Sequence, residues 1–145
     1  MNKMSFSLKQ YGSKKILIID DDSDILFSFQ CAFEMEGYEV RIAKNGQEAF
    51  DLLGSLKDSE LPDIIMLDYS MPIMDGKHFS LAKATIPRLA QIPVVLMTAS
   101  GEINRIFRSM DAAAYLDKPL DLDQMMKVVF NFVHRANDSR GCFLA

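Results

Sequence analysis

Histidine and cysteine are scarce in this chain, and tryptophan is absent. The 145 residues include two histidines and two cysteines. Cys31 falls inside a helical pattern and Cys142 lies among the last four residues, so the pair provides neither a disulfide framework nor a set of metal ligands. We expect two reduced thiols, as is typical of a cytoplasmic protein. His78 and His134 lack the neighbours of a catalytic triad or a zinc site, and we expect both to face solvent.

Long hydrophobic runs, excess positive charge and glycine-rich phosphate loops are also missing. No apolar run approaches the roughly 20 residues that a membrane helix needs. Residues 1–13 contain lysines but no apolar signal-peptide core, so we expect a polar N-terminal arm and a cytoplasmic location. The net charge of −4 disfavours binding to nucleic acid, which requires a basic face. Neither GxxxxGK[ST] nor a GxGxxG after the first strand is present, which argues against a nucleotide site.

The chain does contain a regular alternation of apolar runs and helical patterns. The runs at 14–20, 63–68 and 93–98 are apolar almost throughout, which is typical of central parallel strands covered on both faces. The run at 39–44 alternates, as expected of an edge strand, and a fifth run covers 113–118. Helical patterns lie between and after these runs: one starting at Asp22 or Ser23 and ending near Gly37, then 47–56, 77–85 before Pro87, 102–110, and one starting at Asp121.

Charged and polar residues stand where four of these strands end. The first strand ends in Asp20 and Asp21, the third in Asp68, the fourth in Thr98 and the fifth in Lys118. Ligands gather at the carboxyl ends of the strands in an open parallel sheet. Several carboxylates in one place repel each other unless a cation is present, and Mg²⁺ prefers such oxygen ligands. The sequence therefore predicts a Mg²⁺ and phosphate site at this end of the sheet.

Five motifs in this order give the chain a resemblance to a known family. The motifs are ILIIDDDSDIL, NGQEAF, DIIMLDYSMPIMDG, PVVLMTAS and AYLDKP. Together they resemble the receiver domain of two-component response regulators, close to the single-domain chemotaxis type. The resemblance implies a flavodoxin-like doubly wound α/β fold, with a five-stranded parallel sheet of order 2-1-3-4-5 and five helices. It implies a receiver domain over residues 14–136, between the arm and a C-terminal tail of residues 137–145.

The resemblance also implies a role for each residue at the strand ends. Asp68 would accept a phosphoryl group from a phosphohistidine, and Lys118 would pair with Asp68 and then with the phosphoryl oxygens. Asp20, Asp21, Asp68 and the backbone carbonyl of Ser70 would hold Mg²⁺. Thr98 would donate its hydroxyl to the bound phosphoryl group.

Further residues would shape the pocket and transmit the signal. Ala99 and Tyr69 would line the phosphate pocket, and Ser70 and Ser100 would tune the lifetime of the phosphorylated state. Tyr115 would turn inward when Thr98 moves, which would shift a two-state equilibrium.

The partners that the resemblance implies are proteins. A sensor histidine kinase or a phosphotransfer protein would phosphorylate the chain, and output would pass through an unidentified protein partner or a phosphorylation-dependent homodimer, with no nucleic acid or membrane involved. Phe27 on the first helix, and Val128 with Phe130 on the last, are candidate contact residues.

In place of the Gly-Ala pair usual before the last strand, this chain has SMDAAAYLDKP, so we expect a reduced or irregular helix over 102–110.

Two alternatives remain at this point. Asp20 in an Asp-x-Asp pattern after a strand could be the nucleophile of a Mg²⁺-dependent phosphatase, although the motif MPIMDG is then unexplained. A receiver-fold adaptor that works without phosphorylation is the other. The favoured interpretation is a signalling phosphoacceptor, not an enzyme acting on other substrates.

Overall fold

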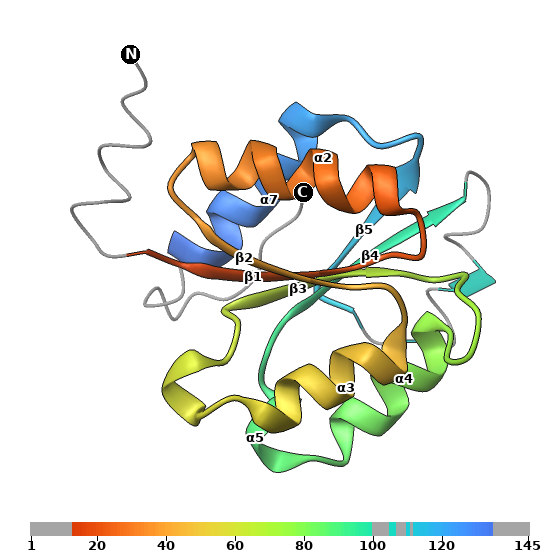
Figure 1. The fold of residues 1–145 in the computed structure, drawn as a ribbon. Helices are drawn as coiled ribbons and strands as arrows, with labels where there is room; N and C mark the ends of the chain where they lie inside the picture. The colour runs from red at the N-terminus through yellow and green to blue at the C-terminus, as the bar shows by residue number, and fades with distance from the viewer. Residues whose placement is uncertain (1–12, 100–104, 107–109, 111, 135–145) are drawn as a thin grey trace.

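The computed structural model describes residues 13–99, 105–106, 110 and 112–134. At its centre is a five-stranded parallel sheet of order β2-β1-β3-β4-β5 (Figure 1). The predicted fold class and strand order are therefore confirmed. The strands are β1 (Lys15–Ile19), β2 (Glu39–Ala43), β3 (Ile64–Asp68), β4 (Val94–Ala99) and β5 (Ala114–Lys118).

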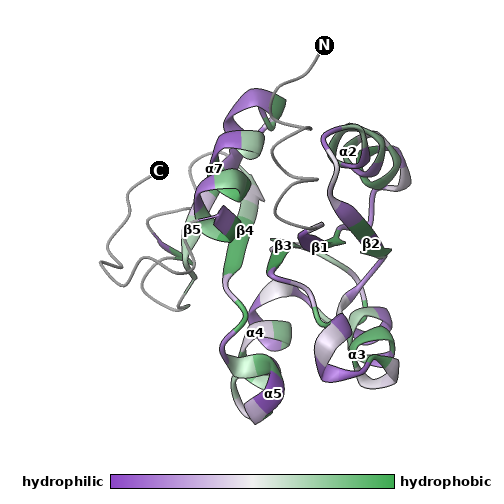
Figure 2. Cartoon of the chain, turned by 90° about the vertical axis from the view of Figure 1, so that its left-hand side faces the viewer, coloured by the Kyte–Doolittle hydropathy of each residue, from purple (hydrophilic) through white to green (hydrophobic). Residues whose placement is uncertain are grey.

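Helices cover both faces of the sheet. One face carries α2 (Ser23–Met35) and α7 (Leu122–His134), and the other carries α3 (Gly46–Ser55), α4 (Gly76–Ala84) and α5 (Pro87–Ala90) (Figure 1). A single 3-10 turn, η1 (Asp58–Glu60), lies between α3 and β3 in the chain. Figure 2 shows the hydrophobic strands β3 and β4 between the two helical layers. Neither α5 nor η1 was predicted from the sequence.

Burial of the central strands follows from this two-sided cover. Every residue of β3 is buried, and successive side chains of a strand point to opposite faces. Ile16 and Ile18 of β1 accordingly pack into the core under α2 and α7. Leu17 and Ile19 pack into the second core, under α3 and α4. The edge strand β2 is only half-covered, and its Ile42 is exposed.

Polar side chains fix where the helices begin. Asp22, Asn45, Asp75 and Asp121 each accept a hydrogen bond from a backbone N–H in the first turn of the following helix. Such caps satisfy N–H groups that have no partner within the helix. Gly37 follows the end of α2 with a φ of 97°, a conformation that glycine adopts at little cost. Of these four caps, Asp22 also lines the pocket of the functional site described below.

The last helix differs from the sequence prediction. Val128, a candidate contact residue, is 2% exposed and packs in the core, so that hypothesis is wrong for this residue. Leu122, the first residue of α7, is exposed. His134, expected to face solvent, is half-buried, and its ring lies 4.4 Å from that of Phe130 and 6.2 Å from that of Tyr38. The wide apolar stripe of α7 thus reflects a wide buried face.

Pro87 acts at two helix ends. It follows the end of α4 as predicted, and it also occupies the first turn of α5. Proline is tolerated there because N–H groups in the first turn have no hydrogen-bond partner within the helix. The turn places Arg88 against the end of α3. Its guanidinium donates to the carbonyls of Leu53 (3.1 Å) and Leu56 (2.6 Å) and to the carboxylate of Asp58 (2.8 Å). Arg88 therefore donates to carbonyls at the C-terminal end of α3, and it adds a second partner to the Leu53 carbonyl, which also accepts the N–H of Leu56 at 3.2 Å.

We expect Arg88→Met to lower the free energy of unfolding by about 1–3 kcal/mol, because it removes charge-assisted hydrogen bonds to two backbone carbonyls. Asp58→Asn is the matched control. It weakens only the ion pair of a carboxylate whose side chain is 82% exposed, and such pairs contribute at most about 1 kcal/mol. Urea unfolding of both variants measures the difference. Equal losses would mean that the ion pair, not carbonyl capping, is the stabilising contact.

One further expectation concerns the segment before the last strand. Most of the helix expected over 102–110, including its irregularity, lies outside the described residues, although Arg105 and Ile106 are helical.

None of the helices within the described ranges has the length and apolar content to cross a membrane.

Candidate functional site

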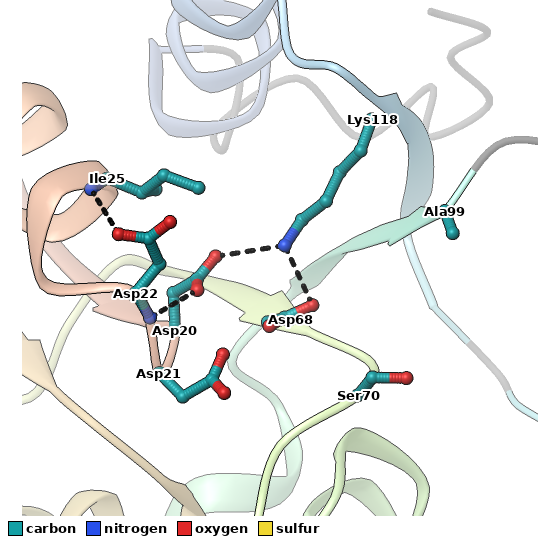
Figure 3. Close-up of a pocket in the computed structure, with 8 residues that line it drawn as sticks. All are labelled: Asp20, Asp21, Asp22, Ile25, Asp68, Ser70, Ala99 and Lys118. Atoms are coloured by element: carbon teal, nitrogen blue, oxygen red, sulfur yellow. Dashed lines mark hydrogen bonds and ion pairs between the residues drawn. The ribbon is translucent and has the colours of Figure 1, made fainter.

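The carboxyl ends of β1, β3, β4 and β5 meet at one end of the sheet. Asp20 follows β1, Asp68 is the last residue of β3, and Lys118 is the last residue of β5. Figure 3 shows their side chains pointing into a common pocket. Parallel strands bring these residues together, since their ends share one edge whatever the sequence separation. The pocket is lined by Asp20, Asp21, Asp22, Ile25, Asp68, Ser70, Ala99 and Lys118.

Lys118 contacts two of the carboxylates. Its Nζ lies 3.1 Å from Oδ1 of Asp68 and 3.3 Å from Oδ2 of Asp20. The other oxygen of Asp20 accepts the backbone N–H of Asp22 at 2.9 Å. Burial opposes the charge of Lys118, but Asp20 and Asp68 outweigh it and raise the pKa of the ammonium group. The lysine is therefore a permanent positive charge beside Asp68.

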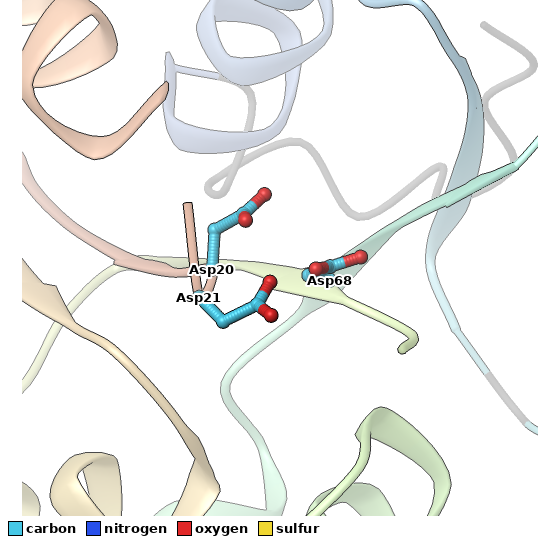
Figure 4. Close-up of side chains that lie close together, drawn as sticks. All are labelled: Asp20, Asp21 and Asp68. Atoms are coloured by element: carbon cyan, nitrogen blue, oxygen red, sulfur yellow. The ribbon is translucent and has the colours of Figure 1, made fainter. Parts of the chain in front are cut away.

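Three carboxylates form a compact acidic cluster. Asp20, Asp21 and Asp68 each offer an oxygen, and these three atoms all lie within 4.8 Å of one another (Figure 4). Asp20 and Asp68 are buried, whereas Asp21 is exposed. One lysine cannot neutralise three negative charges at this separation. Hard carboxylate oxygens around an open pocket fit Mg²⁺, which keeps part of its water shell and takes one or two carboxylates.

The surroundings of Asp68 change the pKa of its carboxyl group. Its side chain is 5% exposed. Burial, followed by repulsion from Asp20, raises its pKa to about 6, although the ammonium of Lys118 acts in the opposite direction. A carboxylate with a raised pKa is held in an unfavourable ionised state at neutral pH. A cation bound in this pocket would therefore stabilise the ionised form of Asp68.

The remaining predicted residues surround this cluster to different degrees. Thr98 is buried at the end of β4, and Ala99 next to it lines the pocket opposite Lys118 in the β4–β5 pair. Ser70 is exposed and lines the pocket, while Tyr69 is half-buried. Ser100 lies outside the described residues.

Tyr115 stands apart from the pocket. It is half-buried, packs against the core under α3 and α4, and its hydroxyl donates to the carbonyl of Met110 at 2.9 Å.

The turn after Asp68 depends on a glycine. The N–H of Gly76 donates to the carbonyl of Tyr69 at 2.8 Å. A Cβ at position 76 would lie 2.8 Å from the carbonyl oxygen of Asp68 and 2.9 Å from Cα of Tyr69. Only glycine permits α4 to begin so close to the end of β3. Ile73 in this turn has a φ of 70° and an exposed side chain, an unfavourable conformation for a β-branched residue.

Two pocket residues were not among the predicted site residues. Asp22 and Ile25 line the pocket from the start of α2. The sequence carried one signal for them, because a helix that begins directly after a strand-end acid must place its first turn beside that acid.

Comparison with known proteins decides the family. The family model of the response regulator receiver domain matches residues 16–130. The chain belongs to the response regulator receiver domain family. Receiver domains are components of two-component signal transduction systems, and they interact with histidine kinases or phosphotransfer proteins.

Individual relatives agree with this assignment. The chain is 33% identical over 123 residues to sporulation initiation phosphotransferase F of Bacillus subtilis, covering 83% of this chain and 94% of the relative. It is 36% identical over 125 residues to RpaA of Synechocystis, a DNA-binding dual master transcriptional regulator, covering 85% of this chain but only 50% of RpaA. The signal receiver domain of a histidine kinase from Syntrophus aciditrophicus superposes with a TM-score of 0.76 at 27% identity, over 92% of this chain and 99% of that domain. Receiver domains thus occur alone and within longer proteins.

Proposed function

We propose that this receiver domain accepts a phosphoryl group on Asp68 from a phosphohistidine, in a Mg²⁺-dependent reaction. The observation that carries the proposal is the position of Asp68, a buried carboxylate at the bottom of an open pocket, 3.1 Å from the ammonium of Lys118 and grouped with two further acids. A carboxylate oxygen of Asp68 would attack phosphorus while the phosphorus–nitrogen bond of the donor breaks, and the imidazole leaves with a proton from solvent.

The surrounding residues supply charge and position for this transfer. Asp20, Asp21, Asp68 and the backbone carbonyl of Ser70 would hold the ion, and bound Mg²⁺ supplies positive charge opposite the phosphoryl oxygens. Lys118 would move from its carboxylate partners to a phosphoryl oxygen. Thr98 would donate its hydroxyl to another. Ala99, with its small side chain, would leave room for the group, and Tyr69, which follows Asp68 in the chain, would line the space that the phosphoryl group fills.

Phosphorylation would change the side-chain positions of Thr98 and Tyr115, and a partner would recognise this change. Drawing the Thr98 hydroxyl toward the phosphoryl group vacates volume at the end of β4. Tyr115 would leave the Met110 carbonyl and turn into that volume, so phosphorylation favours one of two existing arrangements. Ser70 and Ser100 would set how readily water attacks the aspartyl phosphate. Output would pass to a protein partner, or to a second copy of the chain, that binds the altered face.

Phosphorylation of the unmodified chain tests the proposal directly. The protein is incubated with phosphoramidate, a small phosphodonor, with Mg²⁺ or with EDTA, and is weighed intact. We expect a gain of one phosphoryl group with Mg²⁺ and none with EDTA, because three carboxylates that one lysine cannot neutralise repel the donor. Turnover of many equivalents of a phosphate ester would favour the phosphatase alternative. A chain that gains no phosphoryl group yet binds a partner would favour the adaptor.

A further inference from the structure

The outer face of α2 carries an apolar stripe that no described element covers. Phe27 is 68% exposed, Met35 is 79% exposed, and Cys31 between them is also exposed. These residues are four apart, so they form one line along about two turns of the helix. The opposite face of α2 packs in the core through Leu26 and Phe33. The stripe is therefore separate from the contacts that hold the fold together.

The stripe lies in a negatively charged surrounding. Residues 21–37 include five acids and no lysine or arginine. Asp24 lies one turn before Phe27, and Glu34 lies one turn after Cys31; both are exposed. An occupant of this face must bring apolar side chains to the stripe and positive charge to its two ends.

Residues 1–12 have that chemistry. They include Lys3 and Lys9 and no acid. Although the segment is polar overall, Met4, Phe6 and Leu8 alternate with polar residues. In an extended chain, alternate side chains lie on one side about 6.6 Å apart. Residues four apart on a helix rise about 6 Å, so the two spacings match.

The segment also joins the described chain beside the end of α2. The carbonyl of Lys14 accepts the N–H of Glu39 at 2.9 Å, at the start of β2. Glu39 follows Met35, at the end of α2, after only three intervening residues. The six residue-to-residue steps from Leu8 to Lys14 span up to about 20 Å when extended. This reach is sufficient for Leu8 to meet the last turn of α2.

We propose that residues 1–12 dock along the outer face of α2, with Leu8, Phe6 and Met4 against Met35, Cys31 and Phe27. In this register Lys9 and Lys3 flank the docked residues, so the segment brings one positive charge to each acidic end of the stripe, near Glu34 and near Asp24. The first turn of α2 also forms the wall of the phosphorylation pocket through Ile25. A protein that approaches the pocket across α2 must then displace residues 1–12. The segment would therefore compete with that protein for the outer face of α2. The docking itself does not depend on phosphorylation.

Cys31 provides a reporter at the centre of the stripe. In a Cys142→Ser background, the rate of alkylation by iodoacetamide is measured for the full chain and for a chain lacking residues 1–12. We expect the full chain to react about tenfold more slowly, equivalent to about 1.4 kcal/mol of docking free energy. Lys3→Glu with Lys9→Glu should raise the rate in the full chain close to that of the shortened chain.

A matched reporter separates docking from a general effect on thiol reactivity. Ser59 is exposed on η1, in the layer on the opposite side of the sheet. Ser59→Cys in a chain with Cys31→Ser and Cys142→Ser should react at the same rate with and without residues 1–12. Thermal unfolding of each chain confirms that the fold is retained. Equal Cys31 rates in the full and shortened chains would overturn the proposal.

A distance measurement identifies the occupant. A nitroxide on Ser5→Cys, with both natural cysteines replaced by serine, should broaden the methyl NMR signal of Met35. The signal of Met74, which is partly buried and packs against the core on the other face of the sheet, should stay sharp. Broadening that appears only between chains in a mixture of spin-labelled and isotope-labelled protein, and that grows with concentration, would assign the stripe to a second copy and overturn the docking of residues 1–12.

Discussion

Asp68→Asn is expected to abolish phosphorylation by phosphoramidate and, in the absence of Mg²⁺, to make the protein more stable. Loss of phosphorylation follows because an amide is not a nucleophile toward phosphorus. The gain in stability has a separate cause. Asp68 is 3% exposed and lies beside Asp20 and Asp21. Replacing its carboxylate with an amide of the same shape removes a buried charge that its neighbours repel.

The raised pKa of Asp68 sets the size of this gain and its dependence on pH. Between pH 3.8 and about 6 the folded state binds a proton that the unfolded state has released. Stability of the metal-free protein therefore falls as the pH rises through this window. The full rise in pKa corresponds to about 3 kcal/mol. Asp68→Asn should recover about 1–3 kcal/mol of it at pH 7, since Lys118 loses one of its partners in the variant.

Urea unfolding in EDTA at several values between pH 4 and pH 7 measures the effect. The difference between the unmodified chain and Asp68→Asn isolates one carboxylate from the others that titrate in this range. Asp123→Asn, at an exposed position on α7, serves as a control that should keep both phosphorylation and the original pH profile. A phosphoryl group gained by Asp68→Asn would show that the acceptor is another residue, with Asp20 examined next.

Gly76→Ala is expected to lower the free energy of unfolding by about 1–3 kcal/mol, as overpacking does in a well-packed interior. The added methyl group meets the Asp68 carbonyl oxygen at 2.8 Å and Cα of Tyr69 at 2.9 Å. Both are backbone atoms at the end of β3, so neither can rotate away. Relief requires α4 and the end of β3 to separate, which moves Asp68 relative to Lys118. Phosphorylation by phosphoramidate should therefore slow as well.

Gly54→Ala supplies the matched control. Gly54 is helical and exposed in α3, and a Cβ there meets nothing within 4 Å. Alanine in a helix is favoured over glycine by about 0.5–1 kcal/mol, so this variant should be slightly more stable and phosphorylate normally. Thermal unfolding and intact mass of both variants give the comparison. Normal stability of Gly76→Ala would mean that the turn after Asp68 adjusts without strain.

Periodicity in the sequence was enough to place the strands and most helices. Continuous apolar runs such as 63–68 predicted buried strands, because a strand covered on both faces has no polar side. The start of α2 was uncertain by one residue, and the hydrogen bonds accepted by Asp22 resolved it. The short helix α5 was missed, since a four-residue turn after Pro87 has no periodicity to detect. Its role is visible only through the long-range contacts of Arg88 with α3.

Burial was predicted less well than secondary structure. Val128 was expected at a contact surface and His134 in solvent, yet Val128 is buried in the core and His134 is half-buried beside Tyr38. Lys83 is buried in α4, where its ammonium donates to the carbonyl of Ala90. Nothing in the local pattern distinguishes it from a solvated lysine. A helical pattern gives the direction of a side chain but not the depth of the neighbouring element.

The sequence by itself determined the order of the elements, the residues at each strand end and the family to which those motifs belong. It could do so because strand patterns and helix caps are local properties, and the alternating order of strands and helices implies a parallel sheet whose strands end at one edge. Only the tertiary structure decided that Lys118 lies between Asp20 and Asp68, that the pKa of Asp68 rises to about 6, and that position 76 has no room for a methyl group. Those properties depend on distances of a few ångströms between segments far apart in the chain. Coulomb energies and steric contacts change steeply over such distances, and the spacing of residues along a sequence does not specify them.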